Sequence, residues 1–161
     1  ESYINTDLHI YSSVYSSQYQ YLVMELNDLI SRNSLNNKVK ICFDYLPEYE
    51  ITRELVKADL IVYPYQNSNE SSSAAVRNGL KSGSPIAITP LGVFQDVEQI
   101  AYMFSGFSAQ ELSIDIKNWH KNEISKSYEQ IKCDKQNIIN WLDQFDFKKV
   151  ALRLENMIEA L

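Results

Sequence analysis

The chain has 161 residues, is 45% hydrophobic and carries a formal net charge of −6. This length suits one domain that buries about 70% of its unfolded surface, and the acidic balance argues against a nucleic-acid-binding surface, which needs clustered Lys and Arg. The two cysteines, Cys42 and Cys133, provide neither a disulfide framework nor a metal-binding pattern, and no apolar run is long enough to span a membrane.

The first third of the sequence alternates short apolar runs with amphipathic stretches. Apolar and polar residues alternate over residues 7–11, which is typical of a strand and favours a strand-face position for His9 over a catalytic role. A polar loop is expected at residues 12–17. The same spacing arguments predict strands at residues 7–11 and 39–43 and helices at residues 19–32 and 48–57.

The stretch from residue 58 to residue 90 has the pattern of two buried strands joined by a helix. Pro64 ends the first strand because it cannot donate a ladder hydrogen bond. Gly83 is expected to end the helix with a positive φ. Two buried strands joined by one helix form a right-handed βαβ unit with parallel strands. The expected elements are a strand at residues 60–63, a loop at 65–69, a helix from about Glu70 to Gly83 and a strand at 85–89.

The loop at the start of this helix holds the groups best suited to bind a ligand. The free N–H groups of the first helical turn, expected near Ser71 to Ala74, point out of the carboxyl edge of the sheet, where open α/β sheets bind ligands. Glu70 would place a carboxylate beside them that accepts hydrogen bonds from sugar hydroxyls. A phosphate on the amides with a sugar under the carboxylate fits this pattern. In the alternative, Asn69 and Glu70 only cap the helix and complement its dipole, and spacing alone leaves both interpretations open.

Residues 58–97 resemble the donor-binding half of a GT-B glycosyltransferase, particularly family 4 (glycosyl transferases group 1). The family pattern is a strand ending in Pro-Ser or Pro-Tyr, an acidic residue opening a helix, and a glycine-x-proline before the next strand. Its counterparts here are Pro64-Tyr65, Glu70 and Gly83-Ser84-Pro85. Family members carry two glutamates separated by seven residues, one near the donor sugar and one near the ribose. Glu70 fits the first place, but Asn78 stands at the second, and an amide cannot supply a charge-assisted hydrogen bond.

The resemblance implies an α/β fold, a Rossmann-like parallel sheet with helices on both faces, in which residues 1–161 form a single nucleotide-sugar-binding domain. In the usual strand order 3-2-1-4-5-6, the chain supplies strands 2 to 6 but not the central strand 1. Strands 2 and 4 would each expose an edge toward that gap. We therefore expect the chain to be a segment of a longer two-domain enzyme, in which upstream residues supply strand 1 and an N-terminal acceptor-binding domain.

The residues after the βαβ unit allow two interpretations of the next loop. Leu91 to Phe94 either offer backbone N–H groups to a sugar or base, with Asp96 facing the cleft, or form a loop around a buried Phe94. Further on, Ser108 and Glu111 have the spacing of a capping box that opens a helix. We expect a strand at residues 101–104 and helices over about residues 108–161, with residues 117–132 forming a solvated helical face.

The resemblance implies the donor-binding half of a metal-independent glycosyltransferase, which moves a sugar from a nucleotide-sugar to an acceptor with retention and without a cofactor. Glu70 would orient the donor sugar, and Arg77 is a further candidate for contacting phosphate. Catalytic residues of the acceptor domain lie outside this chain, which is not expected to turn over by itself. The expected substrate-binding residues are Tyr65, Glu70, Ser71, Ser72, Ser73, Ala74 and Asn78.

The expected setting is the bacterial cytoplasm, with the periphery of the inner membrane as an alternative, and the expected pathway is glycan or polysaccharide biosynthesis. The expected partners are the nucleotide-sugar donor and the N-terminal domain of the same polypeptide. Asn78 in place of a glutamate favours an alternative of another class, a non-catalytic GT-B-like domain that serves ligand binding or assembly.

Overall fold

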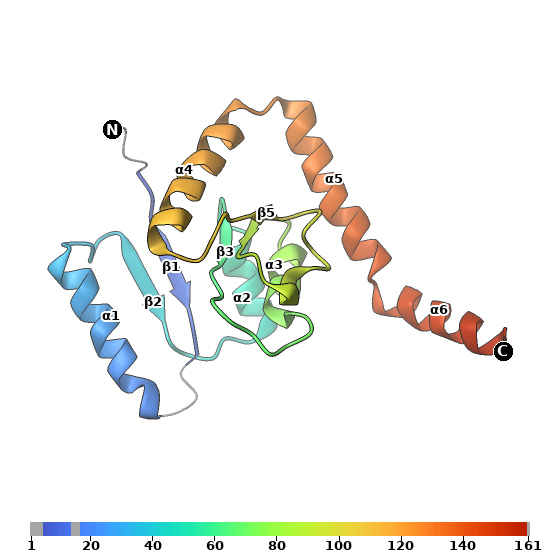
Figure 1. Cartoon of the computed structure of the whole chain (residues 1–161), viewed down its shortest axis with the longest axis horizontal. Helices are drawn as coiled ribbons and strands as arrows, with labels where there is room; N and C mark the ends of the chain where they lie inside the picture. The colour runs from blue at the N-terminus through green and yellow to red at the C-terminus, as the bar shows by residue number, and fades with distance from the viewer. Residues whose placement is uncertain (1–4, 14–16, 161) are drawn as a thin grey trace. The chain divides into compact units, whose positions relative to one another are not determined.

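The computed structural model describes residues 5–13 and 17–160, and the chain divides into two compact units. The first unit spans Glu1–Pro47 and the second spans Glu48–Leu161. Figure 1 shows the course of the chain, from the first strand to the helices at its C-terminal end. The predicted binding loop therefore lies wholly within the second unit.

The first unit contains a parallel two-stranded sheet and one long helix. Its elements are β1 (Leu8–Tyr11), the 3-10 turn η1 (Ser17–Tyr19), α1 (Gln20–Arg32) and β2 (Val39–Cys42). Leu8 lies opposite Val39 in the parallel ladder. His9 lies on β1, as the alternating pattern predicted, and its side chain is exposed. The expected strands and helix are confirmed, while residues 14–16 of the expected polar loop lie outside the described residues.

The second unit is built on a three-stranded parallel sheet. Its strands are β3 (Ile61–Tyr63), β4 (Ile86–Ile88) and β5 (Tyr102–Met103), in the order β3-β4-β5. In the ladders, Ile61 lies opposite Ile86 and Ala87 lies opposite Tyr102. Successive side chains of a strand point to opposite faces, and every residue of β4 is buried. Both faces of the sheet are therefore covered at β4.

The remaining elements of the second unit are helical. They are α2 (Glu48–Leu55), α3 (Ala74–Lys81), the 3-10 turn η2 (Gly92–Phe94), α4 (Ala109–Ser125), α5 (Tyr128–Gln144) and α6 (Phe147–Glu159). The capping box of Ser108 and Glu111 is confirmed at the start of α4. A second capping box, formed by Ser127 and Gln130, separates α4 from α5 inside the stretch expected to be one solvated helical face. None of the helices in the described ranges is long and apolar enough to cross a membrane.

The helix α3 begins later than the sequence indicated. The expected start at about Glu70 is wrong, because Ser73 takes the N-cap position and its Oγ accepts a hydrogen bond from the Val76 N–H. Upstream, the Ser68 Oγ accepts from the Glu70 N–H at 3.1 Å, a local bond that competes with helix formation. The other end is as expected: Gly83 has a φ of 76°, in the left-handed region that favours glycine.

The core of the second unit packs the sheet against α3, α5 and the segment after β4. Gly79 lets α3 approach the sheet closely, because a Cβ there would lie 2.3 Å from the Tyr63 hydroxyl oxygen. That hydroxyl donates to the Ala75 carbonyl at 2.8 Å. The buried residues of this core are Ile61, Tyr63, Val76, Leu80, Ile86, Ile88, Val93, Phe94, Val97, Ile138 and Trp141.

The parallel strands fall into two separate sheets. Among the strands that the structure describes, β1 pairs with β2 alone and β3 pairs with β4 alone, so each keeps one edge without a strand partner. The α/β, Rossmann-like fold class is confirmed, and an upstream strand that joins the two sheets stays a prediction.

Candidate functional site

Three segments of the second unit meet at the carboxyl edge of β3 and β4: the loop after β3, the first turn of α3 and the segment after β4. Ligands bind at this edge in open α/β sheets. The Thr89 hydroxyl donates to the Tyr65 carbonyl at 2.6 Å. The rings of Tyr65 and Phe94 lie 5.1 Å apart between centroids. The loops after β3 and β4 are therefore joined by a hydrogen bond and a ring contact.

Tyr65 and Ser73 fix the first turn of α3 to the end of β3. The Tyr65 hydroxyl and the Ser73 Oγ lie 3.4 Å apart, and the Ser73 Oγ also accepts from the Val76 N–H. Ser73 is only 3% exposed, whereas Tyr65 is half-buried. The structure thus gives Ser73 a capping role, and contact of either residue with a substrate stays a prediction.

The first amides of α3 are unsatisfied backbone groups on this surface. The first N–H groups of a helix have no intrahelical acceptor, and the Ser73 side chain satisfies the Val76 N–H. The N–H groups of Ala74 and Ala75 have no hydrogen-bond partner within the described part of the chain, and both residues are exposed. The helix dipole makes this end attractive to an anion. Because α3 starts late, its first free amides are those of Ala74 and Ala75, and an anion-binding role for the amides of Ser71 to Ala74 stays a prediction.

Glu70 provides a carboxylate just before this turn. Its side chain is exposed and has no hydrogen-bond or ion-pair partner among the residues described. Ser71 beside it is exposed and Ser72 is half-buried. The alternative in which Asn69 and Glu70 cap the helix is wrong, because Ser73 is the cap. The Glu70 carboxylate is free to accept hydrogen bonds from hydroxyl groups.

Asn78 lies on the same side of α3 as the free amides. Its position four residues after Ala74 and three after Ala75 places it on their face of the helix, one turn further along. The residue is half-buried. Its side-chain amide has no hydrogen-bond partner in the described ranges, so it keeps both a donor and an acceptor for a ligand.

Arg77 and Asp96, both considered for the cleft, are paired with each other. The Arg77 Nη2 donates to the Asp96 carboxylate, and the Arg77 Nη1 donates to the Ser73 carbonyl at 3.3 Å. Phe94 is 1% exposed. Of the two interpretations of the 91–94 segment, the one with a buried Phe94 is confirmed.

The chemistry that this surface offers is binding of an anion and of hydroxyl groups. Burial, the largest cause, raises the pKa of the Tyr63 hydroxyl far above its ordinary value, so this group stays protonated on the Ala75 carbonyl. Within residues 5–13 and 17–160, no three His, Cys, Asp or Glu side chains lie together as a metal site would require. The free groups of this surface include the backbone amides of Ala74 and Ala75, the Glu70 carboxylate and the Asn78 side-chain amide.

Comparison with known proteins relates this fold to sugar-transferring enzymes. No protein-family model matches the sequence, and no curated protein matches it. Among solved structures, Anabaena Alr3699/HepE in complex with UDP aligns over 97% of this chain with a TM-score of 0.75 and 19% identity. This chain has a GT-B glycosyltransferase-like fold. HepE in complex with UDP-glucose aligns over the same share with a TM-score of 0.69 and 17% identity.

A plant enzyme shares the fold over slightly less of the chain. The catalytic domain of starch synthase IV from Arabidopsis thaliana, bound to ADP and acarbose, aligns over 85% of this chain with a TM-score of 0.62 and 14% identity. The aligned chain covers 41% of HepE and 29% of the starch synthase domain. The sequence therefore spans about two fifths of the length of HepE, and at these identities the likeness is one of fold.

Sequence reasoning missed the residues that hold the site together. Thr89 and Phe94 orient Tyr65, yet Thr89 was not assigned to the site and Phe94 was considered there only for its backbone N–H group. The sequence gives one weak signal for Thr89, which is a polar residue directly after a buried strand. In the structure its side chain is buried at the edge where ligands bind. Ser73 was assigned as a ligand, but three consecutive serines left the choice of cap undecided.

Proposed function

We propose that this chain is the nucleotide-sugar-binding half of a glycosyltransferase. The observation that carries the proposal is the free Glu70 carboxylate beside two unpaired amides, Ala74 and Ala75, at the carboxyl edge of a GT-B-like sheet. The amides suit a diphosphate and the carboxylate suits sugar hydroxyls. Both HepE structures and the starch synthase domain hold a nucleotide or nucleotide-sugar, which supports a ligand of this class.

Each group has a role in the proposed transfer. The α3 amides stabilise the negative charge of the departing nucleoside diphosphate, a form of electrostatic catalysis by preorganised donors. Glu70 accepts hydrogen bonds from the donor sugar and orients its anomeric carbon. Asn78 contacts the ribose hydroxyls, while Tyr65, Ser71 and Ser72 border the sugar. The acceptor and its catalytic groups belong to an N-terminal domain of the same polypeptide.

The proposal extends to the wider setting of the enzyme. The resemblance of residues 58–97 to GT-B glycosyltransferases is the basis for proposing a transfer without a bound metal or cofactor and with retention. A cytoplasmic, bacterial role in glycan or polysaccharide synthesis remains part of the same proposal.

Asn78 favours a second candidate, a non-catalytic domain that binds a nucleotide-sugar or serves assembly. A neutral amide makes weaker hydrogen bonds to ribose than a carboxylate does. Replacing Asn78 with Glu distinguishes the two, since an enzyme adapted to Asn78 loses turnover or is unaffected. If instead the natural Asn78 is what abolished transfer, the Asn78→Glu variant should bind the donor more tightly. With the acceptor domain present, it should also show measurable turnover.

Titration of the full polypeptide with UDP-glucose and ADP-glucose tests the main proposal. The Glu70→Ala variant loses a hydrogen bond to a charged group and should bind the donor about 10- to 150-fold more weakly, with an unchanged melting temperature. The matched control is Glu129→Ala. Glu129 is also an exposed carboxylate, but it lies in the first turn of α5 and belongs to none of the segments that form the candidate site. Equal donor affinity in the wild type and the Glu70 variant would refute the donor-site assignment.

A further inference from the structure

We infer that Arg77 and Asp96 are positioning residues, which hold the segment 91–97 against α3 and α5 and thereby fix Tyr65 and Ser73 at the proposed donor site. The contacts that carry this inference are properties of the chain alone. Its consequence for a nucleotide-sugar rests on the proposed function.

Arg77 occupies the junction between α3 and the segment after β4. Its two terminal nitrogens serve different acceptors, the Asp96 carboxylate and the Ser73 carbonyl. The guanidinium carbon also lies 5.9 Å from the centroid of the Trp141 ring, within the range of a cation–π contact. A planar guanidinium satisfies these directions together, whereas a lysine ammonium is a single point charge. Arg77 therefore ties the α3 cap, the 91–97 segment and α5 together.

Asp96 completes the junction through its backbone. The Trp141 Nε1 donates to the Asp96 carbonyl at 2.9 Å, so α5 is bonded to the residue that binds Arg77. Trp141 is also 8% exposed and belongs to the core. The segment 91–97 is thereby held at Asp96 from two helices, by a charge on α3 and by an indole on α5.

The same segment positions the candidate site through Phe94. The Phe94 ring packs 5.1 Å from Tyr65 and 6.5 Å from Tyr63, between centroids. Tyr65 in turn contacts Ser73, whose carbonyl binds Arg77. The contacts close a ring of residues around the first turn of α3. Loosening Asp96 is therefore expected to loosen Tyr65 and Ser73 as well.

The partial exposure of the ion pair argues that its main effect is on position. The Arg77 and Asp96 side chains are 36% and 28% exposed, and exposed ion pairs contribute little to the free energy of unfolding. An alternative role makes the opposite prediction. If Arg77 were a phosphate ligand held away by Asp96, removing the Asp96 charge would free Arg77 and tighten binding of a nucleotide-sugar.

The test uses the full polypeptide and the variants Asp96→Asn, Asp96→Glu and Arg77→Lys, with Asp134→Asn as the matched control. Asp134 also forms a surface ion pair, with Lys126 at 2.7 Å, but outside the ring of contacts. Hydrogen–deuterium exchange is measured by mass spectrometry over residues 62–76 and 90–97, and affinity is measured with UDP-glucose as the probe.

We expect Asp96→Asn to accelerate exchange in both peptides and to weaken UDP-glucose binding about 5- to 20-fold. Arg77→Lys should give a smaller change of the same sign, because the lysine keeps the charge but not the second hydrogen bond. Asp96→Glu should restore most of the affinity and protection, and Asp134→Asn should change neither.

Two results would overturn the inference. Tighter UDP-glucose binding by Asp96→Asn would make Arg77 a phosphate ligand, and unchanged exchange over residues 62–76 would show that the ion pair does not position Tyr65 and Ser73. If the wild type binds neither UDP-glucose nor ADP-glucose, the donor-site proposal loses its support. The exchange experiment then decides the positioning role by itself.

Discussion

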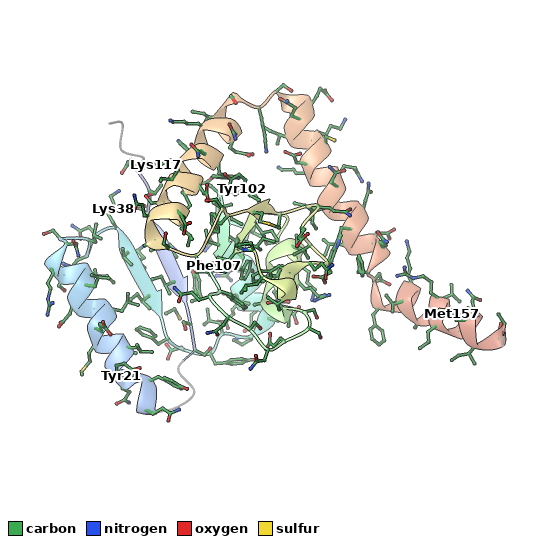
Figure 2. All side chains as sticks on the ribbon, viewed as in Figure 1. Tyr21, Lys38, Tyr102, Phe107, Lys117 and Met157 are labelled. Carbon is green, nitrogen blue, oxygen red and sulfur yellow. The ribbon has the colours of Figure 1, made fainter. Side chains whose placement is uncertain are left out.

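Two amphipathic, capped helices of the second unit, α3 and α6, differ in how much of their apolar face is buried. In α3, Val76, Gly79 and Leu80 are buried against the sheet, and Ser73 caps the N-terminus. In α6, Asp146 caps the N-terminus, but none of the described residues is buried, and Phe147 is 85% exposed. Figure 2 shows Met157 on α6 projecting from the ribbon. The comparison teaches that spacing and caps specify a helix, whereas burial also requires an apolar surface opposite it.

The largest expected difference between the two helices is in the free energy of unfolding that is lost when a leucine is replaced by alanine. Leu80→Ala should lower the free energy of unfolding by about 2–5 kcal/mol, because Leu80 is fully buried. Leu154→Ala, at a position that is 58% exposed, should change it by less than about 0.5 kcal/mol. Urea denaturation of the full polypeptide measures both, and similar losses would mean that α6 is packed in solution.

A second variant tests the close approach of α3 to the sheet. Gly79→Ala should cost about 1–3 kcal/mol of stability, because the new Cβ meets the Tyr63 hydroxyl at 2.3 Å. Tyr63→Phe in the same chain removes that oxygen and should recover part of the loss. If Gly79→Ala stabilises the protein, as a helix propensity alone would predict, the tight contact is refuted.

The end of α3 provides a third test. Gly83→Val should destabilise the protein by about 1–2 kcal/mol, because φ is 76° there and a side chain strains the left-handed backbone. Space is not the cause, since a Cβ at Gly83 would meet nothing within 4 Å. Gly92→Val is the matched control, because Gly92 has open space and no positive φ. A thermal melt with equal shifts in the two variants would contradict the backbone explanation.

The caps give the smallest expected difference. Ser73→Ala should cost about 1 kcal/mol, because it leaves the Val76 N–H without an acceptor inside a packed unit. Asp146→Ala removes the acceptor for the Lys148 N–H on an exposed helix and should shift the melting temperature less. Restoring the cap with Ser73→Asn should recover stability, and a failure to do so would assign the loss to the Tyr65 contact.

Local patterns predicted most of the fold because they act over a few residues. The strands of the βαβ unit, the positive φ of Gly83 and the capping box of Ser108 and Glu111 all follow from short sequence signals. The start of α3 did not follow, because Ser71, Ser72 and Ser73 are all good caps and spacing does not choose among them.

The candidate site was predictable only as a set of free groups. Glu70 and a nearby helix start could be assigned to one loop from the pattern, although the cap itself, Ser73, could not. The pairing of Arg77 with Asp96 joins residues 19 positions apart and depends on how α3, α5 and the 91–97 segment pack. No local signal encodes such a contact, so the sequence left Arg77 as a further candidate for contacting phosphate and gave Asp96 a cleft position in only one of two open interpretations.

The most direct test of the donor site is a crystal structure of the full polypeptide with UDP-glucose. We predict that the diphosphate lies against the N–H groups of Ala74 and Ala75 and that the Glu70 carboxylate accepts hydrogen bonds from the glucose hydroxyls. A nucleotide-sugar bound away from the first turn of α3, with Glu70 still facing solvent, would contradict the account.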